Sequence, residues 1–114
     1  MIDIDYFTSK LYQNKYTIFL FHGVINTSDT EIRNYTNKHI LGEDFESLLL
    51  KLKKMGTPLS LDEVIDYYEK NISLPEHSYS ITFDDGFENN YSVAVPILEK
   101  LVTPATFYVS TNLI

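Results

Sequence analysis

Short apolar runs separated by helical segments constrain the fold of this chain more than any other feature. Three runs have the length and the aromatic or β-branched content of buried strands: Tyr16 to Phe21, Tyr79 to Phe83 and Pro104 to Ser110. Two helical patterns follow the first run, and a third helix, from about Tyr91 to Leu101, follows the second. Pro96 should bend this third helix or mark its true first turn. Because helices alternate with strands, the sequence predicts an α/β fold with a parallel sheet.

Apolar spacing and helix-end residues indicate the two helices after the first strand. Across Glu43–Gly56 the apolar residues recur in steps of three and four and form one stripe, made by Phe45, Leu48, Leu49, Leu52 and Met55. Gly56 fits the glycine that often ends a helix. In the next pattern, Ser60 and Glu63 have the spacing of a capping box. The residues of this second helix predicted to face inward are Leu61, Val64, Ile65 and Tyr68.

Composition excludes several classes of function. The chain has 114 residues, a net charge of −7 and no cysteine. The negative charge argues against nucleic acid as a partner, and the absence of cysteine excludes disulfides and thiolate metal sites. The apolar run Ile18 to Phe21 is too short to span a membrane. The acidic N-terminus does not resemble a signal peptide, so the chain as written is predicted to be cytoplasmic, or extracytoplasmic if a leader is missing.

Two adjacent carboxylates directly follow the second strand. The strand Tyr79 to Phe83 ends in Asp84, Asp85 and Gly86, and the glycine lets the backbone turn sharply. A capped turn is the simpler interpretation of an Asp-Gly pair. Alternatively, both carboxylates converge on one small cation, which would offset their mutual repulsion. His22 ends the first strand at the same edge of a parallel sheet, where ligands bind. It is interpreted as lining a pocket rather than as a metal ligand.

The residues around this pair resemble those of a known family. The run ITFDDGF is similar to the first signature of the polysaccharide deacetylases, also called the NodB-homology domain or carbohydrate esterase family four. Upstream, FLFHGV resembles the opening strand of bacterial members, and DFESLLLKLKKMGTPLSLDEVIDY resembles the helix, short strand and helix before the signature. Downstream, AVPILEKLVTPATFYVS resembles the helix and strand after it. The resemblance begins at about Tyr16, and residues 1–15 are interpreted as an N-terminal extension.

The resemblance implies a fold, a cofactor and a reaction. The fold would be a distorted (β/α) barrel with parallel strands, with residues 1–114 as its N-terminal portion, truncated after the N-terminal half. The reaction would be hydrolytic removal of N-acetyl groups from an amino-sugar polysaccharide or glycan. Asp84 would be the general base, and Asp85 would ligate a divalent metal, usually zinc, that polarises the water and the acetyl carbonyl. His22 and Gly86 would line the pocket.

The resemblance is incomplete. In the family, two histidine ligands follow the strand that matches PATFYVS, and this sequence ends at Ile114 before that point. His39 and His77 are interpreted as solvated. The 114-residue chain alone is therefore expected to bind zinc weakly, to be inactive and to self-associate through open sheet edges. The alternative function is a non-catalytic carbohydrate-binding or interaction module derived from the same fold.

Two other enzyme classes that place acids at a strand end are excluded by spacing. A phosphatase of the haloacid dehalogenase type needs two aspartates separated by one residue, whereas Asp84 and Asp85 are adjacent. A response-regulator receiver needs a phospho-acceptor aspartate on a later strand, and no aspartate follows Asp85.

Overall fold

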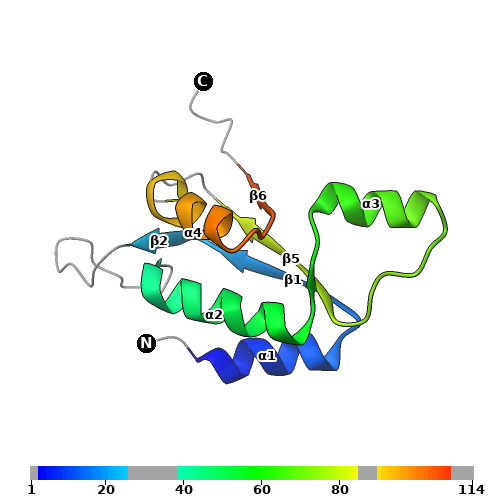
Figure 1. Cartoon of the computed structure of the whole chain (residues 1–114), viewed down its shortest axis with the longest axis horizontal. Helices are drawn as coiled ribbons and strands as arrows, with labels where there is room; N and C mark the ends of the chain where they lie inside the picture. The colour runs from blue at the N-terminus through cyan, green and yellow to red at the C-terminus, as the bar shows by residue number, and fades with distance from the viewer. Residues whose placement is uncertain (1–2, 26–38, 85–89, 109–114) are drawn as a thin grey trace.

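A parallel sheet with helices packed on one face forms the centre of the molecule (Figure 1). The computed structural model describes residues 3–25, 39–84 and 90–108. The sheet contains four strands, which are β1 (Tyr16–Phe21), β4 (Thr57–Pro58), β5 (Ser78–Phe83) and β6 (Ala105–Phe107). β1 pairs with the whole of β5, while β4 pairs with the beginning of β5 and β6 with its end, all in parallel. The predicted α/β fold with a parallel sheet is confirmed.

A second, smaller parallel pair was not predicted. β2 (Gly23–Ile25) pairs with β3 (His39–Leu41), so that Gly23 lies opposite His39 and Ile25 opposite Leu41. These strands of three residues are too short to show a periodicity of their own. The long loop predicted from Asn26 to Lys38 lies outside the described residues.

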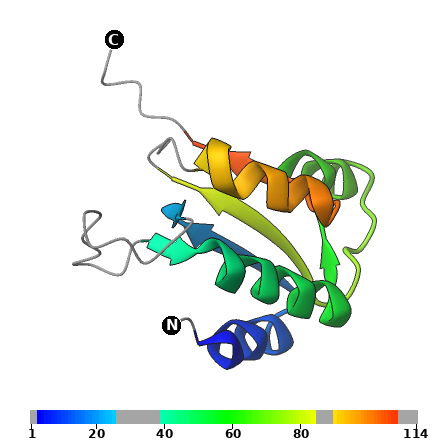
Figure 2. The ribbon, with the colours of Figure 1, turned by 60° about the vertical axis from the view of Figure 1, so that its left-hand side comes forward.

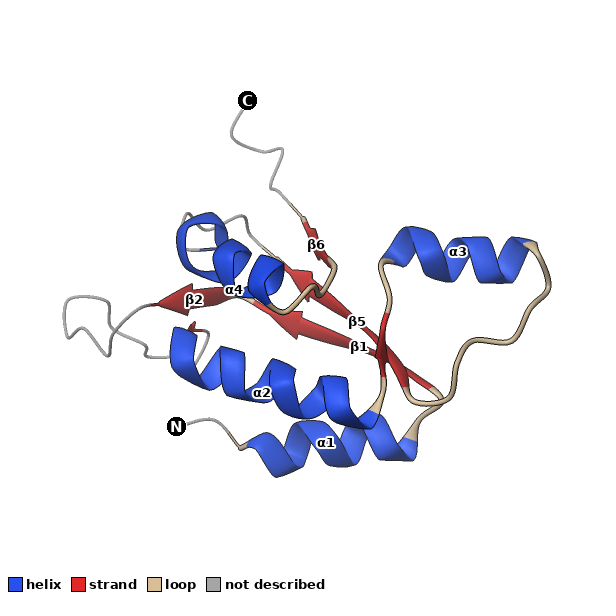
Figure 3. Cartoon of the chain, viewed as in Figure 1, coloured by secondary structure: helices blue, strands red, loops and turns tan. Residues whose placement is uncertain are grey.

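Four α-helices are described, and Figure 3 shows them in blue with the strands in red. They are α1 (Ile4–Gln13), α2 (Gly42–Met55), α3 (Leu61–Glu69) and α4 (Val95–Lys100). A short π-helical turn, η1 (Asn90–Ala94), leads into α4, and Pro96 lies in the first turn of α4. The proline therefore marks the start of the regular helix, because its missing N–H costs nothing there. The view in Figure 2 shows α1, α2 and α4 in front of the strands.

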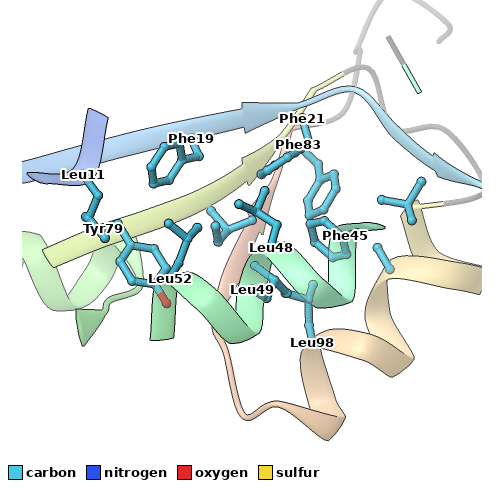
Figure 4. Close-up of a cluster of buried hydrophobic side chains, with 13 residues drawn as sticks. Leu11, Phe19, Phe21, Phe45, Leu48, Leu49, Leu52, Tyr79, Phe83 and Leu98 are labelled. Atoms are coloured by element: carbon cyan, nitrogen blue, oxygen red, sulfur yellow. The ribbon is translucent and has the colours of Figure 1, made fainter. Parts of the chain in front are cut away.

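The core lies between these helices and one face of the sheet (Figure 4). Strand side chains alternate, so β1 contributes Phe19 and Phe21 to this face. β5 contributes Tyr79, Ile81 and Phe83 in the same way. The predicted stripe of α2 covers them, with four fully buried residues: Phe45, Leu48, Leu49 and Leu52.

The N-terminal segment, predicted as an extension, contains a helix that packs on the core. Residues 4–13 form α1, whose N-terminus is capped by the Asp3 side chain accepting the Tyr6 N–H at 3.3 Å. Leu11 is fully buried in the core, and Phe7 packs against it with its ring 5.9 Å from that of Phe21. The helix thus closes the core beside α2.

The inward face predicted for α3 is not buried within the described residues. The capping box of Ser60 and Glu63 is present, with hydrogen bonds of 3.0 and 2.9 Å. No residue of α3 is buried, however, and Ile65 and Tyr68 are 54% and 84% exposed. Amphipathic spacing predicts a helix and its apolar stripe, but it does not identify the surface that covers the stripe.

Gly56 ends α2 as expected, but its conformation is not the one that favours glycine at a helix end. Its φ of −150° is extended, not the left-handed conformation that favours glycine at a helix end. A Cβ at this position would lie only 2.0 Å from the carbonyl oxygen of His77. The glycine is therefore required because the end of α2 approaches the turn before β5 closely.

We expect Tyr79→Phe to leave the free energy of unfolding at neutral pH unchanged or to raise it by about 1 kcal/mol. The Tyr79 hydroxyl is fully buried and has no hydrogen-bond partner among the described residues, which costs free energy. Burial also raises the pKa of Tyr79. An unfolded tyrosine ionises near pH 10, so this residue should lower stability as the pH rises above about 10.

Denaturant unfolding at neutral pH and above about pH 10 measures both effects. Tyr68→Phe is the matched control, since Tyr68 is 84% exposed. A loss of more than about 1 kcal/mol in Tyr79→Phe at neutral pH would show that the hydroxyl has a stabilising partner.

Candidate functional site

Three strands of the sheet end at the same edge. Phe21 and Phe83 are register partners, and the Asp84 N–H donates to the Phe21 carbonyl at 3.0 Å. His22 follows Phe21 directly, so His22 and Asp84 leave the sheet on neighbouring strands. β6 reaches the same edge, where the Tyr108 N–H donates to the Phe83 carbonyl at 2.8 Å. This is the carboxyl edge of the sheet, where parallel sheets bind ligands.

An aromatic cluster supports this edge from the helical side. The rings of Phe83 and Phe107 are stacked with centroids 4.9 Å apart, and Phe45 meets Phe83 edge-on at 5.6 Å. Phe21 completes the cluster, at 5.3 Å from Phe45 and 5.7 Å from Phe83. Phe21 directly precedes His22, and Phe83 directly precedes Asp84. Because both rings pack within this cluster, the backbone at the edge is held in a fixed position.

The opposite face of the sheet carries a chain of polar contacts that sequence analysis missed. The Tyr16 hydroxyl donates to Ser80 Oγ at 2.7 Å, and Ser80 Oγ donates to the Leu59 carbonyl at 2.7 Å. Thr82 Oγ1 donates to the Phe19 carbonyl at 3.1 Å. The signal lies in the alternation of polar and apolar residues along Ser78–Phe83, since alternate residues face opposite sides. These bonds satisfy the buried hydroxyls of Ser80 and Thr82.

The structure locates some of the predicted site residues and leaves others untested. Asp84 and His22 are both half-buried and lie at the carboxyl edge. Asp85 and Gly86 lie outside the described residues. The predicted roles therefore remain predictions: Asp84 as base, Asp85 as metal ligand, and His22 and Gly86 as pocket-lining residues.

The described residues alone do not bring together enough side chains for a metal site. Across residues 3–25, 39–84 and 90–108, no group of three or more His, Asp and Glu side chains could hold a metal ion. A catalytic zinc ion needs three protein ligands, whereas the carboxyl edge offers Asp84 and His22. The described residues therefore do not by themselves make a zinc site.

Of the other two histidines, only His77 has a described side chain, so the predicted solvated position of His39 stays a prediction. His39 lies in β3, and His77 lies in the turn that precedes β5, at the opposite edge of the sheet. His77 was expected to be solvated, but its side chain is only 24% exposed and its Nδ1 lies 3.1 Å from the Leu11 carbonyl oxygen. That expectation was wrong because the C-terminal end of α1, which was not predicted, packs against the turn.

The chain is similar in sequence to characterised deacetylases. The family model described as polysaccharide deacetylase matches residues 71–114, which contain β5, Asp84 and β6. The poly-beta-1,6-N-acetyl-D-glucosamine N-deacetylase of Staphylococcus aureus (strain MSSA476) is 38% identical over 87 residues. That match includes 75% of this chain and 29% of the relative, so the chain spans less than a third of the relative's length. The chain belongs to the polysaccharide deacetylase family.

Solved structures agree with this assignment to the polysaccharide deacetylase family. The deacetylase PplD of Streptococcus pyogenes, in complex with acetate, has a TM-score of 0.72 and 30% identity; the match covers 88% of this chain and 44% of PplD. A de-N-acetylase from Aggregatibacter actinomycetemcomitans has a TM-score of 0.70 and 31% identity, covering 81% of this chain and 36% of that protein. The fold expected from the sequence resemblance, part of a (β/α) barrel with parallel strands, is confirmed.

Among the described residues, none of the helices has both the length and the apolar character that crossing a bilayer requires.

Proposed function

We propose that this chain contributes the catalytic base to a metal-dependent hydrolase that removes N-acetyl groups from an amino-sugar polysaccharide. One observation carries the proposal: Asp84 leaves the central strand at the carboxyl edge of the sheet, within the segment that the family model matches. The relatives and structural neighbours named as N-deacetylases support the same reaction.

The proposed chemistry assigns one proton transfer to this chain. The Asp84 carboxylate takes a proton from a water molecule while the water oxygen forms a bond to the acetyl carbonyl carbon. The carbon–nitrogen bond then breaks, the amine leaves with a proton, and acetate is released. A divalent cation, zinc first among the candidates, with Asp85 as one ligand, would polarise the carbonyl when bound. His22 and Gly86 would shape the pocket beside it.

The proposed substrate is a polymer of N-acetylglucosamine. Support comes from the S. aureus relative, whose name specifies the β-1,6-linked polymer. Chitin-like polymers and peptidoglycan carry the same acetamido group and are the alternatives. A long polysaccharide of this kind occurs outside the cytoplasm. The proposed substrate therefore favours the extracytoplasmic alternative for the location of this protein.

Acetate release from the three polymers by the full-length gene product tests the proposal. We expect acetate from the β-1,6-linked polymer in the presence of zinc. Binding of a polymer without acetate release, with metal bound, would instead support the non-catalytic carbohydrate-binding module.

We also propose that the 114-residue chain alone self-associates through β1. Within the described strands β1 pairs only with β5, so its other edge has no partner strand in the described part of the chain. The face of β1 away from the core exposes Ile18 and Leu20, at 54% and 53%. An open edge beside exposed apolar side chains favours pairing with another chain.

Sedimentation of the 114-residue chain over a range of concentrations should therefore show a mass that increases with concentration. Ile18→Lys should suppress the increase, because a charge on an edge strand opposes pairing. Ile72→Lys is the control, since Ile72 is also 54% exposed but lies outside the sheet. A monomer at every concentration, or equal effects of both variants, would exclude association through β1. Zinc titration of the same sample should show weak binding only.

A further inference from the structure

A groove of about 480 Å³ lies at the edge of the sheet opposite Asp84. It lies between the end of α1 and the turn that precedes β5, and the residues that line it include Tyr12, Asn14, Lys15, Leu74, Glu76 and His77. β5 has six residues, so the groove is roughly 20 Å from Asp84 along the strand. It is therefore separate from the proposed catalytic site.

His77 is fixed in one orientation in this groove. Its Nδ1 lies 3.1 Å from the Leu11 carbonyl oxygen and 3.4 Å from that of Asn14. Carbonyl oxygens only accept, so Nδ1 carries the proton and donates. In the neutral ring Nε2 is then an acceptor, and it lies 4.0 Å from Glu76 Oε1. The backbone of His77 has a φ of 57°, which is uncommon for a residue other than glycine.

Tyr12 provides an exposed aromatic ring beside this histidine. Its ring meets that of His77 edge-on, with centroids 5.0 Å apart and planes at 72°. The residue is 63% exposed although it belongs to a helix that is packed on the core. An exposed aromatic ring that is held by a neighbour can offer contact area at little cost in conformational entropy.

The polar groups around Tyr12 both donate and accept. The Glu76 carboxylate is an acceptor, the Lys15 ammonium is a donor, and His77 Nε2 accepts when the ring is neutral. Opposite charges on Glu76 and Lys15 do not select an anion or a cation. Such a mixture suits a ligand whose groups also donate and accept, with an apolar face that can lie on the aromatic ring. A pyranose sugar has these properties, because its hydroxyls lie around the rim of a ring with C–H faces.

We propose that this groove is a second saccharide-binding site, which holds one sugar unit of a polysaccharide with Tyr12 against the ring face. The choice of polymer rests on the proposed function, whereas the groove and its chemistry do not. A polymer bound here would be held at a distance from the acetyl group that reacts at Asp84. The site would then raise affinity for long chains more than for short ones.

Binding of β-1,6-linked glucosamine oligomers to the 114-residue chain tests this proposal, measured by NMR titration with N-acetylated and deacetylated oligomers in separate arms. We expect at least one of the two kinds of oligomer to shift the NMR signals of the residues that line the groove. Tyr12→Ala should weaken that binding about tenfold, and Tyr12→Phe should preserve it, because the ring face makes the contact. Tyr6→Ala is the control: Tyr6 is 57% exposed on the same helix but does not line the groove.

Two variants distinguish this site from the proposed catalytic site. Asp84→Asn should leave binding at the groove unchanged, and Tyr12→Ala should leave acetate release from a short oligomer by the full-length product unchanged. No binding in either arm, or equal effects of Tyr12→Ala and Tyr6→Ala, would overturn the second site. Failure of acetate release alone would overturn the proposed function and not the groove.

Discussion

Asp84→Asn in the full-length product should lower the rate of acetate release by about 10²- to 10⁴-fold, the usual contribution of a general base. The amide preserves the shape of the side chain but cannot take a proton from water at neutral pH. The backbone should be unaffected, because the N–H of residue 84 still donates to the Phe21 carbonyl. Metal content measured on the same sample should be unchanged.

The neighbouring aspartate provides the matched control for this result. Asp85→Asn should lower the amount of bound metal, since a neutral amide is a weaker ligand than a carboxylate. Activity should then recover in part at high metal concentration, whereas Asp84→Asn should show no such recovery. A rate near that of the wild type for Asp84→Asn would remove Asp84 from the role of base.

Phe45→Ala should destabilise the 114-residue chain by about 3–5 kcal/mol, the usual cost of truncating a buried phenylalanine. Phe45 is fully buried, and its ring contacts both Phe21 and Phe83, at 5.3 and 5.6 Å between centroids. The cavity would therefore open under the two residues that precede His22 and Asp84. Since small domains are stable by only about 5–15 kcal/mol, this loss should be visible as a large shift in denaturation midpoint.

Tyr68→Ala is the control for this second prediction. Tyr68 is also aromatic and helical but is 84% exposed, so its truncation should change the free energy of unfolding by less than about 0.5 kcal/mol. Urea denaturation followed by circular dichroism measures both variants. Equal effects would show that α3 packs against a surface in solution and that the core is not centred on Phe45.

The sheet and α2 could be predicted because their signals are local and dense. The run Tyr16 to Phe21 coincides with β1, and five of the six residues of β5 were predicted from Tyr79 onwards. β5 is buried on both faces, and strands of this kind are continuously apolar or small, so they stand out from polar surroundings. The α2 stripe was equally clear, because four of its predicted members are fully buried.

Features that depend on distant partners could not be predicted. Nothing within the helix sequence indicates that Ile65 and Tyr68 would stay exposed, since burial depends on a neighbouring surface. The environment of His77 depends on the carbonyl groups at the end of α1, more than 60 residues earlier in the chain. Gly56 was correctly expected at the end of α2, but for the wrong reason, because its close neighbour His77 is also distant in sequence.

Part of the candidate site followed from topology alone. In a parallel sheet, the residues that follow neighbouring strands meet at one edge, so the order of strands and helices is enough to bring His22 and Asp84 together. Their chemical roles could not be deduced in this way, and they came from the resemblance to the deacetylase family. The groove beside Tyr12 gave no sequence signal, because its lining comes from two segments that are joined only by the fold.

A crystal structure of the zinc-loaded full-length product would test the central claim most directly, namely that the carboxyl edge of this sheet is the deacetylase site. Anomalous scattering would locate the metal without reference to any assumed ligand. The account predicts one zinc ion at the edge where β1 and β5 end, with Asp85 as a ligand, the Asp84 carboxylate facing the same cavity, and His22 lining it without contacting the metal. A zinc ion bound elsewhere, or bound at this edge through His22 with Asp85 turned away, would contradict it.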